Sequence, residues 1–169
     1  MKEETEIIIC GDLCPTKDTK KYFENQDNDS LFNDIMPIFK NADFVLGNLD
    51  FVLTDSPKPI KKAGPVLHGK TNYIKVLKKA GIQTVSLANN HTKDCGEEGV
   101  KSTIKACKEN DVDFFGAGEN ITKAKVPYIK IVKGYKIGVI TFAEQEFNVA
   151  TATEYGSSFL DPYKDYDKI

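Results

Sequence analysis

The chain has 169 residues, 40% of them hydrophobic and 28% charged, with 23 basic and 25 acidic residues. These proportions are typical of a globular domain and exclude a disordered tail, a collagen-like chain and a coiled coil. No apolar run approaches the roughly 18 residues of a transmembrane helix. The lysines are scattered and lack interleaved aromatic residues, so nucleic acid is not an expected partner.

The cysteines and the first residues of the sequence indicate in which cellular compartment the chain is expected. The four cysteines (Cys10, Cys14, Cys95 and Cys107) show no C-x-x-C spacing. The acidic start, 1–6, runs directly into an apolar segment and resembles neither a signal peptide nor a transit peptide. We therefore expect free thiols and a cytoplasmic chain, or a location at the cell envelope if the sequence is a domain of a longer exported precursor.

The first predicted elements are two strands and a helix. A continuous apolar run predicts a strand over Glu6–Cys10 that is buried on both faces. After a polar loop, Ser30 is expected to cap a helix over Leu31–Phe39, which Pro37 should kink or end. A second buried strand is predicted within Ala42–Leu49, followed by a long loop rich in proline and lysine.

The later elements continue the alternation of strand and helix. They are a helix capped by Thr71 and stopped by Gly81, a strand over Ile82–Leu87, a helix over Gly96–Glu109, a strand over Val112–Phe115, and an antiparallel hairpin of Val126–Val132 with Tyr135–Phe142. This order predicts an α/β fold: a layered domain with a mostly parallel central sheet flanked by helices and a β-hairpin, over residues 1–169.

Polar or acidic groups follow each predicted strand. They are Gly11-Asp12, Gly47-Asn48-Leu49-Asp50, Asn89-Asn90-His91 with Asp94, Gly116-Ala117-Gly118-Glu119, and Glu144-Gln145-Glu146 after the hairpin. Ligands of open α/β sheets bind outside the carboxyl ends of the strands. We therefore expect these groups to converge at one edge of the sheet.

Four residues at this edge indicate a chemistry. Asp12, Asp50 and Asn90 offer oxygen ligands, and His91 an imidazole, which together suit Mn²⁺, Mg²⁺ or Fe²⁺. Two such ions, about 3.5–4 Å apart, would clamp a phosphoryl group. His91 would donate a proton to the leaving oxygen or stabilise charge in the transition state.

Simpler interpretations stand beside this one. Gly-Asp and Asn-Asn pairs are common in turns, and Asp94 is a natural lead into the helix that follows it. Zn²⁺ bound by Cys14, Cys95, His91 and Asp12 is the minor alternative, because no two cysteines have ligand spacing. The lysines at 58–62 are expected to form a solvated surface, with anion capture as the alternative.

Several of these motifs occur together in one known family. They are Gly11-Asp12, the segment Asn41–Asp50, Ala88-Asn89-Asn90-His91 with Asp94 to Gly99, Gly116-Ala117-Gly118, and Phe142-Ala143-Glu144. In this combination the sequence resembles the bacterial capsule-biosynthesis CapA family, the poly-γ-glutamate synthesis proteins related to calcineurin-like metallophosphoesterases. The resemblance runs from about Ile7 to the end of the chain. Asp50 stands where the family usually has Glu, and Cys95 stands where an aromatic residue is usual.

The resemblance implies a metallophosphoesterase-like fold, of which this chain is the N-terminal part, and a role in capsule polymer synthesis. It implies metal ligation by Asp12, Asp50 and Asn90 and catalysis by His91. Substrate contacts are expected from Asn48, Asn89, His68 and Glu144. The implied substrate is an anionic polymer or a phosphorylated small molecule, and other capsule-synthesis proteins are the implied partners.

The end of the sequence bears on whether this chain alone is expected to be catalytically active. Asp161-Pro162 is expected to open a helix that runs to Ile169, and family members continue with further histidine-bearing segments. We therefore expect a chain truncated at its C-terminus. A metal-dependent hydrolase is the first hypothesis and a non-catalytic binding or scaffold subunit the second. A metal-free sugar- or nucleotide-binding module is the third.

Overall fold

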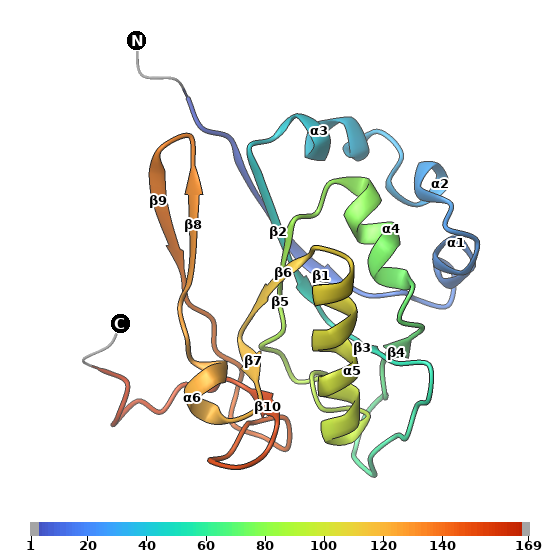
Figure 1. The fold of residues 1–169 in the computed structure, drawn as a ribbon. Coiled ribbons are helices and arrows are strands. Elements are labelled where there is room, and N and C mark those ends of the chain that lie inside the picture. Colours follow the sequence, from blue (N-terminus) through green and yellow to red (C-terminus); the bar gives the residue numbers. More distant parts are fainter. Residues whose placement is uncertain (1–3, 167–169) are drawn as a thin grey trace.

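Four parallel strands form the central sheet of the computed structural model, which describes residues 4–166. Their order in space is β1 (Ile7–Leu13), β2 (Phe44–Leu49), β5 (Thr84–Ser86) and β6 (Asp113–Phe115). One face of this sheet carries the helices α1 (Lys20–Asn25), α2 (Asn28–Phe32), α3 (Ile35–Asn41), α4 (Tyr73–Ala80) and α5 (Gly96–Glu109). The antiparallel hairpin of β8 (Tyr128–Val132) and β9 (Tyr135–Val139) lies on the other face (Figure 1). The predicted α/β class, parallel sheet and hairpin are thereby confirmed.

The remaining elements are short. They are the parallel pair β3 (Val52–Leu53) and β4 (His68–Gly69), the antiparallel pair β7 (Ala117–Gly118) and β10 (Gly156–Ser157), and helix α6 (Ile121–Ala124). Within residues 4–166, no helix combines the length and the apolar character that crossing a bilayer requires.

The two longest helices form where the sequence pattern predicts them. In α4, Tyr73, Val76, Leu77 and Ala80 are buried, and Gly81 ends the helix with a φ of 111° that a residue with a side chain rarely adopts. In α5, Glu97 and Glu98 lie in the first turn and Lys108 in the last, as the helix dipole favours.

Two apolar clusters hold the layers together. The larger one lies between the sheet and the helices and includes Val45, Leu77, Val85 and Ile104. The smaller one joins Phe44, Leu46, Phe115 and Val132 under the hairpin, where Tyr128 stacks on Phe115 with ring centroids 5.3 Å apart.

The first strand differs from its prediction in two ways. It lies at the edge of the sheet, so the side chain of Ile9 is 73% exposed and that of Ile7 39%; the predicted burial on both faces is wrong. The strand also extends to Leu13, with an irregularity in register between Ile9 and Asp12. Ile9 pairs with Leu46 and Asp12 with Asn48, so β1 gains a residue on β2 at this bulge.

The predicted helix over Leu31–Phe39 is also wrong, because the chain breaks at Asn33, where φ is 45°. Asp27, and not Ser30, caps the first piece by accepting a hydrogen bond from the Ser30 amide at 3.1 Å. Pro37 neither kinks nor ends the second piece, since it stands in the first turn of α3, where its missing N–H costs no helical hydrogen bond.

Two segments that the sequence predicts as loops contain a helix or strands, and two predicted helix starts differ in the structure. The polar loop before α2 contains α1, and the loop after Asp50 contains β3 and β4. Thr71 does not cap α4: its amide and hydroxyl instead donate to Asp55, and Asn72 is the N-cap residue. After Asp161 the chain forms a turn over 162–164 and a bend at Asp165, so no helix begins at Pro162 as predicted; Ile169 lies outside the described residues.

Candidate acid–base site

A chain of side-chain amides connects three strand ends at the carboxyl edge of the sheet. Asn48 donates from Nδ2 to Asp12 Oδ1 at 2.7 Å, and its own Oδ1 accepts from Asn89 Nδ2 at 3.0 Å. Asn89 Nδ2 also donates to the carbonyl of Leu49 at 2.9 Å. The structure thus brings together Asp12 near the end of β1, Asn48 near the end of β2 and Asn89 after β5, as the sequence predicts.

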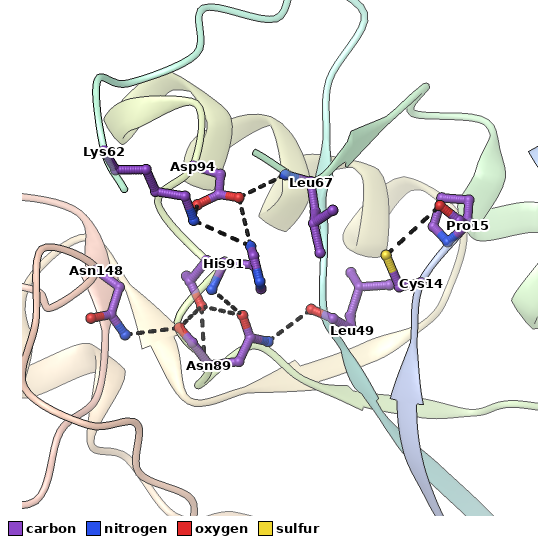
Figure 2. Close-up of polar contacts among 10 residues, drawn as sticks. Cys14, Pro15, Leu49, Lys62, Leu67, Asn89, His91, Asp94 and Asn148 are labelled. Atoms are coloured by element: carbon purple, nitrogen blue, oxygen red, sulfur yellow. Dashed lines mark hydrogen bonds and ion pairs between the residues drawn. The ribbon is translucent and has the colours of Figure 1, made fainter. Parts of the chain in front are cut away.

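His91 joins this network through its backbone and a buried carboxylate through its ring. Its amide donates to Asn89 Oδ1 at 3.0 Å, and its ring Nδ1 lies 2.7 Å from Asp94 Oδ2. His91 is 8% exposed and Asp94 is fully buried. Figure 2 shows the imidazole between Asp94 and Asn89. The sheet edge therefore presents a histidine whose orientation is fixed from two sides.

Asp94 has further partners that sequence reasoning did not assign to the site. Oδ2 also accepts from the Leu67 amide at 2.7 Å, and Oδ1 forms an ion pair with Lys62 Nζ. Lys62 Nζ lies 3.3 Å from His91 Nδ1 (Figure 2). The expected solvated surface at 58–62 is therefore wrong for Lys62, whose side chain is 6% exposed. The three-residue spacing of His91 and Asp94 within one turn is a usable sequence signal, whereas Lys62 comes from a loop that gives none.

The segment after the hairpin contributes different residues from the one predicted. Asn148 is fully buried and donates from Nδ2 to the carbonyl of Asn89 at 2.8 Å, and the ring of Phe147 lies 4.9 Å from Lys62 Nζ. Glu144, the predicted substrate contact, is exposed in the same segment. The segment converges on the site as predicted, through Phe147 and Asn148, and a substrate contact by Glu144 stays a prediction.

Two other predicted site residues, Asn90 and His68, are exposed and make none of the contacts described above. Asn90 is exposed beside the buried Asn89, and its metal role stays a prediction. His68 is exposed on β4 and lines a separate cavity of about 290 Å³ with Lys20, Glu24 and Asp55. Neither Asp12 nor His91 lines this cavity, and a substrate contact by His68 stays a prediction.

Burial is the main cause of the pKa shifts at this edge. It raises the pKa of Asp50; among the neighbouring charges, His91 and Lys62 lower this pKa, and Asp12 and Asp94 raise it. Burial, together with the charges of the same three carboxylates, raises the pKa of the nearby Cys14 thiol to about 11, so it is protonated at neutral pH.

Comparison with known proteins identifies the family. The family model described as "Bacterial capsule synthesis protein PGA_cap" matches residues 6–167. The chain belongs to this family.

Two relatives agree with this membership. The chain is 33% identical over 165 residues to "Capsule biosynthesis protein CapA" of Bacillus anthracis, a match that covers 95% of this chain and 40% of the relative. It is 33% identical over 138 residues to "PGA biosynthesis protein CapA" of Bacillus subtilis (strain 168), covering 79% of this chain and 36% of the relative. The chain thus spans about two fifths of the length of these PGA_cap relatives.

The donor set at the edge can be tested against the metal that the family resemblance implies. The donor types fit a divalent cation, because a positive charge near the carboxylates of Asp12 and Asp50 would favour the ionised form of Asp50, whose pKa is raised. The number of donors falls short. Among residues 4–166, no three His, Cys, Asp or Glu side chains come close enough to hold an ion, and this applies equally to the zinc set with Cys14 and Cys95. A metal at this edge therefore stays a prediction for the described residues of this PGA_cap chain.

Replacing Asp50 with asparagine is expected to stabilise the fold at neutral pH. A carboxyl whose pKa is higher in the folded than in the unfolded chain costs stability as the pH rises above the ordinary value of 3.8, because the folded state resists ionisation. The gain from Asp50→Asn should therefore be largest at neutral pH and shrink as the pH falls toward that value. Urea unfolding of both proteins across this range measures it.

Asp55→Asn is the control with the opposite sign. Hydrogen bonds from Thr71 lower the pKa of Asp55, so its ionised form contributes stability at neutral pH that is lost as the pH falls. Asp55→Asn should destabilise the fold at neutral pH. Equal effects of the two substitutions would contradict the electrostatic account of Asp50.

Proposed function

We propose that this chain supplies the acid–base histidine and part of the cation shell of a hydrolytic site that serves capsule polymer biosynthesis. Membership of the PGA_cap family and the names of the two CapA relatives support the biosynthetic role. The observation that carries the chemical part is the buried His91–Asp94 pair beside the carboxylates of Asp12 and Asp50. The substrate would be a phosphoester or a related anionic linkage, in a capsule polymer or a phosphorylated precursor.

In this proposal each ring nitrogen of His91 has its own task. Nδ1 is occupied by Asp94, so Nε2 is the ring nitrogen that would exchange a proton with the attacking water or the leaving oxygen. Asp94 orients the ring and would stabilise the imidazolium that forms. The amides of Asn48 and Asn89 hold the carboxylate of Asp12 and the backbone of His91 in place.

A divalent cation would add electrostatic stabilisation. Asp12, Asp50 and Asn90 would hold Mn²⁺, Mg²⁺ or Fe²⁺, with one or two ions and further ligands from water, substrate or other polypeptide. When bound, the cation would polarise a phosphoryl oxygen and offset the carboxylate charge that otherwise repels an anionic substrate.

His91→Ala is the direct test of this proposal. With Mn²⁺ and an aryl phosphate, loss of the general acid–base group should lower the turnover of the chain by about 10²–10⁴-fold. Lys101→Ala is the matched control, since Lys101 pairs with Glu98 on the surface of α5 and should leave turnover unchanged. Equal turnover of the His91 variant and the unaltered chain would reject the acid–base role.

The second candidate is a non-catalytic binding or scaffold subunit of the capsule machinery. The observation that favours it is the small supply of ligands: the sequence has two histidines, and residues 4–166 form no group of three metal-binding side chains. This function predicts no turnover by the unaltered chain and no change in its thermal stability on adding Mn²⁺ or EDTA. Binding of an anionic polymer or of another capsule-synthesis protein would then be its measurable property.

A further inference from the structure

We propose that the cavity between α5 and α6 docks a short segment of a partner protein in which an apolar side chain is flanked by acidic residues. The cavity has a volume of about 470 Å³, a size typical of ligand sites in proteins. None of the lining residues that the structure describes belongs to the acid–base site, so this docking function is separate from the proposed hydrolysis.

The walls of the cavity carry apolar side chains from several segments. Ile104 of α5 is 9% exposed, while Phe114 of β6 and Tyr155 before β10 are partly buried against the larger apolar cluster. Val126, which precedes the hairpin, is 55% exposed and adds to this lining. Transfer of an apolar side chain from water onto such walls is favourable, so the cavity selects a ligand group without charge.

Contacts outside the cavity hold these walls in place. Strand β7 contacts both α5 and α6 and pairs with β10 (Figure 1). The amide of Tyr155 donates to Glu97 Oε2 at 3.0 Å, and Asn120 caps α6 by accepting a hydrogen bond from the Lys123 amide at 3.0 Å. A ligand that enters a preformed cavity orders little of the protein, so less of its binding free energy is lost.

The charged side chains that line the cavity favour an acidic partner. Lys108 comes from the last turn of α5 and Lys123 from α6, and neither ammonium forms an ion pair with a residue of the described range 4–166. Lys108 Nζ instead lies 5.8 Å from the centroid of the Phe114 ring. Glu119 is the acidic side chain in the lining. Two positive charges against one negative charge attract carboxylates on either side of the apolar group.

Other anionic ligands match the cavity less well. The glycine-containing segment beside it does not form a phosphate-binding loop, because Ala117–Gly118 is a strand paired with β10. The sequence also has no arginine, the residue that clamps phosphate through two parallel hydrogen bonds. A polymer with a charge on every unit would pair with the lysines but leave Ile104 and Tyr155 without an apolar partner.

Fluorescence anisotropy of labelled peptides with the full chain tests the proposal. The probe is a nine-residue peptide with a central Leu-Phe-Leu and three glutamates on each side. It should bind, and added salt should weaken the binding because exposed charges contribute to it. Three comparison probes should bind at least about tenfold more weakly: the peptide with a central triple serine, the peptide with lysines in place of glutamates, and a γ-linked glutamate oligomer of equal length.

Substitutions of exposed residues locate the binding in the cavity. Lys108→Met and Lys123→Met should each weaken it about 2–5-fold, as expected for loss of an exposed ion pair, and Glu119→Gln should strengthen it by a similar factor. Lys105→Met is the matched control, because Lys105 pairs with Glu109 and lines a different cavity. All four substituted side chains are exposed, so the variants are expected to fold.

Every outcome supports or overturns the proposal. Equally tight binding of the triple-serine peptide or of the γ-linked oligomer would overturn it in favour of a surface for an anionic polymer. Equal binding of the lysine peptide, no binding of any probe, or equal effects of Lys108→Met and Lys105→Met would also overturn it. His91→Ala should bind the probe as tightly as the unaltered chain, so the docking and the hydrolytic proposals fail independently.

Discussion

Asp94→Ala is expected to lower the free energy of unfolding by about 3–5 kcal/mol, the cost of removing one member of a buried ion pair. The substitution leaves the ammonium of Lys62, Nδ1 of His91 and the amide of Leu67 without their partner. The side chains of Lys62 and His91 are only 6% and 10% exposed, so water replaces the lost carboxylate poorly. Urea unfolding followed by circular dichroism measures the loss.

Glu109→Ala is the matched control for this prediction. Glu109 pairs with Lys105 at 3.7 Å, and both side chains are largely exposed, so the loss should stay below about 1 kcal/mol. Asp94→Asn, which keeps the volume of the side chain, should lie between the two. A cost for Asp94→Ala no larger than that for Glu109→Ala would show that the buried cluster contributes little to stability.

Phe44→Ala is expected to cost about 3–5 kcal/mol, because a fully buried phenyl ring is replaced by a cavity. Phe44 belongs to the small cluster that attaches the hairpin to the sheet, and its ring centroid lies 6.2 Å from that of Tyr128. The loss should therefore be accompanied by faster amide hydrogen exchange in β8 and β9 than in α4. Denaturant unfolding and hydrogen exchange give the two readouts.

Tyr163→Ala is the control for Phe44→Ala, because it removes an aromatic side chain that is exposed instead of buried. Tyr163 is 95% exposed and should be replaceable with a change within about 0.5 kcal/mol. If exchange in Phe44→Ala rose equally in the hairpin and in α4, the smaller cluster would not be the specific attachment of the hairpin.

The sequence predicts the fold class and part of the site for a physical reason. Parallel strands end at the same edge, so residues directly after them meet there whatever the loops do, and Asp12, Asn48 and Asn89 are found connected. The periodic burial of α4 and α5 is likewise a local property that the sequence pattern carries.

The parts of the fold and of the site that the sequence does not predict depend on contacts between segments far apart in the chain. Lys62 reaches Asp94 across 32 residues, and Asn148 reaches Asn89 across 59, so no local pattern reports them. The run Ile7–Ile9 is apolar throughout, yet the position of β1 at the sheet edge leaves Ile9 largely exposed. Asn33, with its left-handed backbone, divides a segment whose apolar spacing alone predicts one helix.

The bulge in β1 determines on which side of the sheet the carboxylate of Asp12 lies. From Ile9 to Asp12 the strand advances three residues while β2 advances two, from Leu46 to Asn48. Side chains alternate between faces, so in a regular strand Ile9 and Asp12 would point to opposite sides. With the extra residue, Asp12 lies beside Asn48 and accepts a hydrogen bond from its side-chain amide. The one extra residue between Ile9 and Asp12 thus places a carboxylate at the end of an apolar strand on the same side as Asn48, within reach of its amide.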